Sequence, residues 1–410
     1  MSNGAPAPLL EVKGLRTHFF TREGVVKAVD EVSFQVDRGE ILGLVGESGC
    51  GKSVTSLSIL RLVPYPGRVV AGEVWFDGRN LMEIPRDEMP DVRGKQIAMI
   101  FQQPQSSLNP VYRAGNQIGE AMEIHLDLAD EEIDERVIDL LKEVGIPDPR
   151  RRAESFPHEL SGGMAQRVMI AMALAAGPDL LIADEPTTAL DVTIQAQILD
   201  LIRRLNRDLG MGVILITHDL GVVAEMADRV AVMYAGEIVE EAEVRELFKD
   251  PLHPYTQGLI GSVPRLGEVT DQLAVIPGVV PTLIDLPPGC RFASRCQARI
   301  EHGLEICTRV KPELLPADDG HLVRCWIYHD EDGRRKTEGR RKTEAGRRKP
   351  GDGSRETEDG GEDGSRETDD APSGPSGNLQ QHSLRSLGEE EVAPLLGEEA
   401  LETPEVSAHE

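Results

Sequence analysis

Residues 46–53 carry the most specific signal in this chain and read Gly46-Glu47-Ser48-Gly49-Cys50-Gly51-Lys52-Ser53. The short apolar run Ile41–Val45 precedes them, and a helical pattern of apolar residues as far as Leu62 follows. The form G-x-x-x-x-G-K-[ST] between a strand and a helix is the Walker A phosphate-binding loop. Its glycines let backbone N–H groups turn around a phosphate, and the helix N-terminus adds the positive end of its dipole. The sequence therefore predicts a nucleotide site in which Lys52 reaches the β- and γ-phosphates and Ser53 ligates Mg²⁺.

Two further apolar runs end in polar residues. Leu180–Ala183 leads into Asp184 and Glu185, and Val213–Ile216 leads to His218. Ligands of open parallel sheets bind at the carboxyl ends of the strands, so we expect these side chains beside the Walker loop. Asp184 is suited to hold Mg²⁺ through water, Glu185 to polarise the attacking water, and His218 to contact the γ-phosphate. Singly, Glu185 could cap a helix and His218 could end a strand without function. Beside the loop, a catalytic cluster is the better interpretation.

Composition limits the remaining alternatives. The chain has 410 residues and a formal net charge of −27, which disfavours a general affinity for nucleic acid. No apolar run approaches the roughly 18–20 residues that cross a bilayer, and the N-terminus has no signal-peptide pattern. Five cysteines, an odd number, argue against a disulfide framework. We expect a soluble intracellular protein of about two domains.

Residues 330–410 differ in character from the rest. They are Gly-rich, highly charged and low in complexity, with Gly-Arg-Arg-Lys repeated at 333–336, 339–342 and 346–349. So few apolar residues cannot offset the entropy of ordering the chain. The sequence predicts a disordered acidic tail.

A second Ser/Gly sequence lies between the predicted strands. Ser161, Gly162 and Gly163 open a long apolar helix predicted over Ala165–Ala176. Backbone N–H groups at such an entry form another anion site. Because the Walker loop already holds the phosphates in cis, this second site best suits the nucleotide of a partner subunit.

From residue 9 to about 328, the chain resembles the ATP-binding subunit of an ATP-binding cassette (ABC) transporter. Ser161-Gly162-Gly163 matches the family's signature motif, and Asp191 matches the D-loop aspartate. Gln102 matches the Q-loop glutamine, which touches Mg²⁺ and senses the membrane subunits. An aromatic residue usually stacks on adenine, and Phe20 is our choice, with Phe19 as the rival.

Other segments resemble the importer branch for dipeptides, oligopeptides and nickel. They are Met164 after the signature glycines, Ser107–Pro110 after the Q-loop, His253–Thr256, and Ile276–Pro281 before the cysteines. The resemblance implies an α/β fold, a P-loop NTPase core with an antiparallel β subdomain and a helical subdomain. We expect a nucleotide-binding domain over 9–250, its helical subdomain over about 111–176, and a C-terminal extension over 251–329.

The extension contains four of the five cysteines: Cys290, Cys296, Cys307 and Cys325. Four thiols within 36 residues are more often a metal site than four unrelated core cysteines. Their spacing leaves zinc and an iron–sulfur cluster equally open, and four unliganded buried cysteines are the third alternative. The resemblance implies a [4Fe–4S] cluster of structural role.

The resemblance also implies a mechanism and partners. Two ATP molecules lie between head-to-tail nucleotide domains, the second domain belonging to a related ATPase subunit, with a homodimer as the alternative. Two transmembrane permease subunits and, indirectly, an extracellular solute-binding protein complete an importer on the cytoplasmic face of the membrane. Peptides are the first substrate candidate, with nickel, other metal chelates and sugars open. The rival functions are a soluble ABC ATPase unconnected with transport, and a non-enzymatic metal or redox sensor built on the cysteines.

Overall fold

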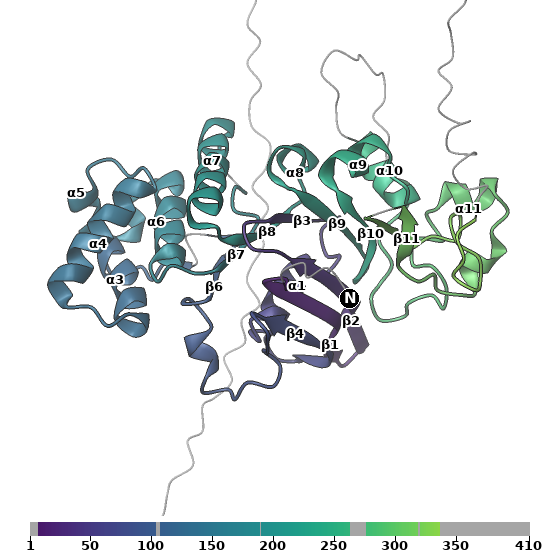
Figure 1. The fold of residues 1–410 in the computed structure, drawn as a ribbon, viewed down its shortest axis with the longest axis horizontal. Coiled ribbons are helices and arrows are strands. Elements are labelled where there is room, and N and C mark those ends of the chain that lie inside the picture. The colour runs from purple at the N-terminus through teal and green to yellow at the C-terminus, as the bar shows by residue number, and fades with distance from the viewer. Residues whose placement is uncertain (1–6, 104–106, 189, 263–275, 319, 337–410) are drawn as a thin grey trace, which may run out of the picture. The chain divides into compact units, whose positions relative to one another are not determined.

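The computed structural model describes residues 7–103, 107–188, 190–262, 276–318 and 320–336. An eight-stranded sheet organises them, in the order β11-β12-β10-β9-β3-β8-β7-β6 (Figure 1). Five strands of this sheet are parallel: β3 (Ile41–Val45), β6 (Ile97–Ile100), β7 (Leu180–Asp184), β8 (Gly212–Thr217) and β9 (Arg229–Tyr234). Three join antiparallel to their neighbours: β10 (Glu237–Glu243), β11 (Leu315–Asp318) and β12 (His321–Val323).

Both faces of the parallel strands are buried, which explains their nearly continuous apolar sequences. On β8, Ile214 and Ile216 join the apolar cluster on one face, whereas Val213 and Leu215 join the cluster on the other. The run predicted as the strand before the phosphate loop has the same bounds as β3, and the other two predicted runs lie within β7 and β8. The predicted α/β fold is confirmed.

A second, antiparallel sheet covers one face of the central sheet. Its order is β2-β1-β4-β5, with β1 at Leu10–Thr21, β2 at Gly24–Val36, β4 at Gly67–Phe76 and β5 at Arg79–Asn80. Its apolar residues share a cluster with the central strands and with helix α1 (Lys52–Ile59). The antiparallel β subdomain expected from the resemblance is thus present.

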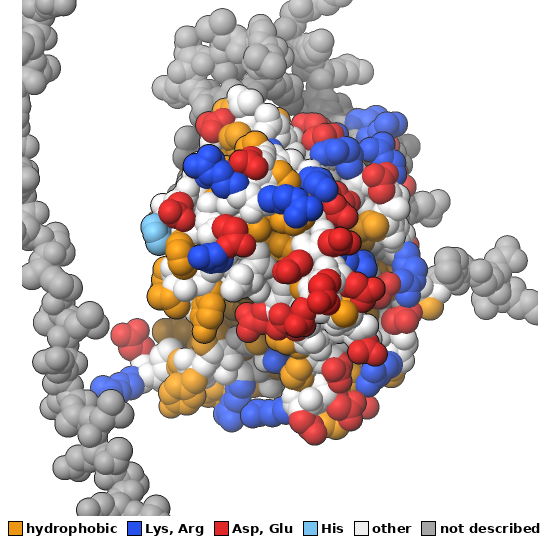
Figure 2. Space-filling view, turned by 90° about the vertical axis from the view of Figure 1, so that its left-hand side faces the viewer, with side chains coloured by type: hydrophobic (Ala, Val, Ile, Leu, Met, Phe, Trp, Pro, Cys, Tyr) orange, Lys and Arg blue, Asp and Glu red, His pale blue; other side chains and the backbone are white. Residues whose placement is uncertain are grey.

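Helices form a second subdomain beside β6 (Figure 1). They are α3 (Ala114–His125), α4 (Asp130–Glu143), α5 (Pro149–Ala153) and α6 (Gly162–Leu174), with a 3₁₀ turn at Pro157–Glu159. Another 3₁₀ turn, Met89–Asp91, precedes β6 and packs Met89 into the cluster of the antiparallel sheet. Helix α4 is amphipathic and buries Ile133, Val137 and Leu141. Seen from this side, acidic side chains gather in a band across the surface (Figure 2).

The remaining helices are α7 (Val192–Leu209), α8 (Leu220–Met226), α9 (Val244–Lys249), α10 (Pro254–Gly261) and α11 (Gln297–Glu301), with a 3₁₀ turn at Glu305–Thr308. Within the described ranges, none of the helices combines the length and the apolar character that crossing a bilayer requires.

Three helix boundaries differ from the sequence prediction, one of them the end of α6, which lies at Leu174 in place of Ala176. Helix α1 ends at Ile59 instead of continuing to Leu62, because Arg61 takes a left-handed conformation with φ 53° and turns the chain away. Helix α6 begins at Gly162, three residues before the predicted start, because the Ser161 side chain caps it. Most of the predicted disordered tail, residues 337–410, lies outside the described residues.

The C-terminal extension is part of the central sheet. Strand β12 pairs with β10, placing Glu240 opposite Val323. Glu240 is fully buried, and its carboxylate accepts hydrogen bonds from the backbone N–H groups of Leu252 and His253 and pairs with His321 at 2.7 Å. The boundary expected near residue 250 therefore falls between α9 and α10, inside one compact unit.

Candidate functional site

The phosphate loop connects β3 to α1 and passes close to neighbouring backbone. Gly46 has φ 152°, and a Cβ there would lie 2.1 Å from the carbonyl oxygen of Met233. Gly51 has φ 110°, and its Cβ would lie 2.3 Å from the carbonyl oxygen of Ala28. Only glycine meets both requirements, so the two glycines of the motif set the shape of the loop.

The start of α1 is suited to an anion. Gly51 is the N-cap and supplies no side-chain acceptor, and the first turn contains no carboxylate. The N–H groups of that turn therefore keep their partial positive charge for a phosphate. Lys52 is buried, and its Nζ donates to the carbonyl oxygens of Gly46 at 2.8 Å and Glu47 at 3.2 Å. The predicted phosphate-binding lysine thus lies inside the loop.

Asp184, the last residue of β7, lies against the loop. The Ser53 hydroxyl and the Lys52 ammonium act on its carboxylate, and its buried Oδ1 has no hydrogen-bond partner among the described residues. Burial raises the pKa of Asp184, although Ser53 and Lys52 act in the opposite direction. A divalent cation would satisfy the unpaired oxygen and favour the ionised carboxylate. The two side chains therefore fit the predicted magnesium site.

Glu185 follows directly, and its carboxylate is held by three neighbours. Oε2 accepts hydrogen bonds from Gln102 Nε2 at 2.7 Å and Thr188 Oγ1 at 2.9 Å, and Oε1 lies 3.2 Å from His218 Nδ1. Burial alone would raise the pKa of Glu185, but bonds from Thr188, His218 and Gln102 lower it overall. The backbone of Glu185 is left-handed, with φ 47°, a conformation that costs about 1–3 kcal/mol and is typical of active sites.

Three predicted catalytic residues therefore meet in one hydrogen-bonded group at the ends of β6, β7 and β8. Glu185 is mostly buried, whereas the His218 side chain is 65% exposed and faces outward, as contact with a nucleotide requires. Thr188 is a partner of Glu185 that the sequence analysis did not identify. A hydroxyl residue three positions after the carboxylate was its only sequence signal.

The signature residues form a different site. Ser161 caps α6 by accepting the N–H of Met164 at 3.3 Å, and Asp191 caps α7 through the N–H groups of Thr193 and Ile194. Ser161, Asp191 and both glycines, Gly162 and Gly163, line one hollow of about 520 Å³.

The hollow beside the Walker loop has other walls. Gly46, Glu47 and His218 line a space of about 160 Å³ to which the signature residues do not contribute. The two groups of anion-binding residues in this chain thus lie apart.

Phe20 lies near the end of β1 and is 39% exposed as a residue. The Arg68 guanidinium carbon lies 4.1 Å from its ring centroid, so that one face of the ring is already covered. Phe19, the rival, packs near Gly67 and Val63. Stacking of Phe20 on adenine stays a prediction.

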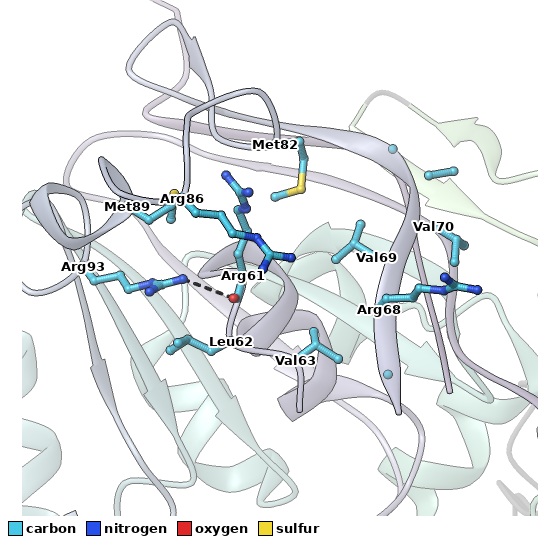
Figure 3. Close-up of a pocket in the computed structure, with 13 residues that line it drawn as sticks. Arg61, Leu62, Val63, Arg68, Val69, Val70, Met82, Arg86, Met89 and Arg93 are labelled. Carbon is cyan, nitrogen blue, oxygen red and sulfur yellow. Dashed lines mark hydrogen bonds between the residues drawn. The ribbon is translucent and has the colours of Figure 1, made fainter. Parts of the chain in front are cut away.

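A larger hollow, of about 670 Å³, opens between the end of α1, β4 and the segment before β6 (Figure 3). Four arginines line it, and Arg93 donates to the carbonyl oxygen of Arg61 at 3.1 Å. No residue of the phosphate loop is among its lining residues, so it is separate from the nucleotide site.

The four cysteines of the extension lie in one neighbourhood as free thiols. Burial is the main cause that raises the pKa values of these thiols, to about 12 for Cys290 and about 11 for Cys307. The charges of the other three thiols also raise the pKa of Cys325. Yet across the described residues no three His, Cys, Asp or Glu side chains are arranged to hold a metal ion. The geometry of Cys290, Cys296, Cys307 and Cys325 thus lends no support to the predicted iron–sulfur or zinc site.

A Walker loop and residues suited to magnesium at the ends of parallel strands, with a signature motif that lines a separate hollow, define an ATP-binding cassette. The chain matches the ABC transporter family over residues 29–188 and the oligopeptide/dipeptide transporter C-terminal region over residues 239–302.

Named relatives extend this match along both regions. A probable peptide ABC transporter ATP-binding protein of Sinorhizobium fredii is 54% identical over 79% of this chain and 96% of its own length. The oligopeptide transport ATP-binding protein OppD of Bacillus subtilis is 51% identical over 79% of this chain and 90% of its own. The dimeric cassette MJ0796, solved with ADP and Pi, has a TM-score of 0.53 at 30% identity and covers 58% of this chain and 99% of its own.

The chain belongs to the ABC transporter ATP-binding subunits that carry the oligopeptide/dipeptide transporter C-terminal region. It is an ABC-type ATPase.

Proposed function

We propose that this ATPase drives the import of short peptides through membrane permease partners. The observation that carries the proposal is the separation of the Walker loop from the signature hollow, since a site divided in this way works only in a pair of cassettes. The substrate class rests on the relatives: proteins about half identical over nearly their whole length are named for oligopeptide and dipeptide transport.

In the proposed mechanism, Lys52 leaves the carbonyl oxygens of its own loop and turns to the β- and γ-phosphates. Ser53 and Asp184 hold Mg²⁺, with Gln102 as a further ligand. When bound, Mg²⁺ neutralises charge on the phosphate oxygens. The Ser161–Gly163 segment closes on the γ-phosphate of the partner's ATP, while the partner's segment closes here.

Glu185 is the proposed base for the attacking water. Its lowered pKa keeps it ionised at neutral pH, and its bonds from Gln102, Thr188 and His218 fix its direction. A carboxylate so placed accepts the proton that water releases as it attacks the γ-phosphate. His218 lies beside it and is exposed enough to contact that phosphate. Asp191, in the signature hollow, is proposed to act across the cassette interface.

The proposed partners are two permease subunits, a second and related ATPase subunit, and, indirectly, an extracellular solute-binding protein. We expect a heterodimer of ATPases at the cytoplasmic face of the membrane, held there by the permeases. The Q-loop residue Gln102 supports coupling to the permeases, because it bonds to the catalytic Glu185 and would transmit a movement to it.

The test is purification from the native membrane in mild detergent, followed by mass spectrometry of the associated proteins. Two multi-span permeases and a second ATPase support the importer, and the solute-binding protein that accompanies them is then titrated with peptides, nickel chelates and sugars. A soluble or ribosomal partner without any membrane protein would refute the transport role. Binding of nickel or sugar, and not of peptides, would refute the substrate class alone.

We propose separately that the four cysteines of the extension take up an iron–sulfur cluster, with zinc as the alternative. The proposal rests on the number and spacing of the four cysteines, and as the side chains now lie they would have to lose protons and draw together around the metal. Metal and sulfide analysis of protein purified without oxygen tests it. Stoichiometric iron and sulfide that disappear in Cys325→Ser are expected, and protein free of iron and zinc would contradict it.

A further inference from the structure

An arginine of the extension contacts the phosphate loop. Arg295, two residues before α11, has a side chain only 4% exposed. Its Nη1 lies 2.7 Å from Glu47 Oε2 and its Nη2 lies 3.0 Å from Glu47 Oε1. Such a paired contact between guanidinium and carboxylate is directional as well as strong. Glu47, the second residue of the Walker loop, is thereby tied to a residue 248 positions away.

The guanidinium is itself held in place. Nε donates to the carbonyl oxygen of Pro277 at 2.8 Å, and Nη1 donates to the hydroxyl of Tyr234 at 3.4 Å. The rings of Tyr234 and Phe292 lie 5.7 and 5.9 Å from the guanidinium carbon. Because its surroundings fix Arg295, the arginine can fix Glu47.

The extension also holds the backbone of Glu47. The N–H of Glu47 donates to the hydroxyl of Tyr255, a fully buried residue of α10, at 2.8 Å. In the next peptide unit, the carbonyl oxygen of Glu47 accepts from Lys52 at 3.2 Å. When Lys52 turns to a phosphate, the loop loses that contact and keeps those to Tyr255 and Arg295.

We propose that Arg295 is a positioning residue for ATP binding, which holds the phosphate loop in its binding conformation through Glu47 and so lets the C-terminal extension set the affinity for ATP. A loop that must be ordered at the moment of binding lowers the apparent affinity by the fraction of time it is disordered. Arg295 does not contact Glu185 or His218, and the effect therefore falls on binding and not on the chemical step.

The test uses the full-length chain for titration with a fluorescent ATP analogue and Mg²⁺, and the assembled complex for steady-state hydrolysis. In Arg295→Met, the Kd and KM for ATP should rise about fivefold or more, with kcat within about twofold of the wild type. Arg295→Lys keeps the charge but not the paired geometry, and its Kd for ATP should lie between those of the wild type and Arg295→Met. Glu47→Gln should also raise the Kd for ATP. The double variant of Arg295→Met and Glu47→Gln should have a Kd no higher than that of whichever single variant binds ATP more weakly.

Arg291→Met is the matched control. Arg291 is also in the extension and equally buried, but its partners are Asp30, Glu237 and the carbonyl oxygen of Ala235, all outside the phosphate loop. It should lower thermal stability, with Kd for ATP within about twofold of the wild type, because the phosphate loop keeps its contacts.

Two results would overturn the proposal: an unchanged Kd in Arg295→Met, or a rise in Arg291→Met as large as that in Arg295→Met. If Arg295→Met does not fold, Arg295→Lys and Glu47→Gln decide, and a wild-type Kd in both would equally overturn it.

Discussion

Replacing Glu185 by Gln tests the proposed chemistry most directly, because the change removes the base and little else. The glutamine carbonyl oxygen can accept from Gln102 and Thr188 as Oε2 does now. Its NH₂ group then takes the place of Oε1, 3.2 Å from His218 Nδ1, and donates to that nitrogen if the histidine proton is on Nε2. One altered hydrogen bond should change the free energy of unfolding by about 0.5–1.5 kcal/mol.

The effect on turnover should be much larger. General-base catalysis contributes about 10²–10⁴ in rate, which corresponds to about 3–5.5 kcal/mol of activation free energy. We expect kcat for ATP hydrolysis to fall by at least about a hundredfold, with the Kd for ATP within about threefold of wild type, because the phosphate-binding residues are unchanged. Since hydrogen bonds hold the pKa of Glu185 below its ordinary value of 4.5, the wild-type rate should not lose this base until the pH falls below that value.

The assay is phosphate release by the assembled complex, with ATP binding measured in parallel on the same preparations. Glu225→Gln is a matched control, because Glu225 is an exposed carboxylate paired only with Arg203 in the described structure. It should hydrolyse ATP at the wild-type rate. Turnover of Glu185→Gln within about tenfold of the wild type would refute the assignment of Glu185 as base, since a positioned base contributes more than that.

Three further predictions follow from the loop, the signature and the extension. Gly51→Ala should weaken ATP binding at least about tenfold and lower the melting temperature, because the added Cβ would lie 2.3 Å from the Ala28 carbonyl oxygen. Gly49→Ala should have smaller effects, because a Cβ at that position would meet open space. Equal effects of the two variants in nucleotide titrations and thermal unfolding would contradict this reasoning. Ser161→Ala should lower the free energy of unfolding by about 1 kcal/mol, because the cap of α6 is lost. It should reduce ATP turnover by the complex at least about tenfold, while the isolated chain binds ATP normally. A matching loss of ATP binding by the isolated chain would argue against a divided site. Burial lowers the pKa of His253 from 6.5 to about 3, so between these pH values the unfolded chain binds a proton that the folded chain does not bind. The free energy of unfolding should therefore fall by at most about 1.4 kcal/mol per pH unit as the pH drops from 6.5 toward 3. His253→Asn should flatten that decline in denaturant titrations, and parallel curves for variant and wild type would disprove the role of His253.

Much of the nucleotide site could be predicted because its signals are contiguous in the chain. The Walker loop follows β3 directly, and Asp184 and Glu185 follow a short apolar run typical of a buried parallel strand. Parallel pairing of β3, β8 and β7 then brings the strand ends together. For these elements, local sequence and one rule of sheet topology were sufficient.

The contacts that depend on distant segments could not be predicted. The sequence around Glu47 and Arg295 does not indicate that these two residues pair. Glu240 lies in a charged segment typical of a surface, yet it is fully buried because β12 packs over it. The cysteine spacing suggested a ligand set, but side-chain geometry depends on the packing of α11 and the turns around it. Such contacts arise from tertiary structure, which residue spacing does not encode.

The shared sheet of cassette and extension has a consequence for anyone who shortens or recombines this chain. A chain cut after Asp250 would keep β9 beside β10 but remove β12 from its other edge, and the backbone groups left unpaired there are the usual template for strand-to-strand aggregation. It would also strip Glu240 of the donors from Leu252, His253 and His321. The shortest truncated chain that we expect not to aggregate therefore includes β11 and β12. A chimaera between relatives should exchange β10 together with the β11–β12 hairpin that pairs with it.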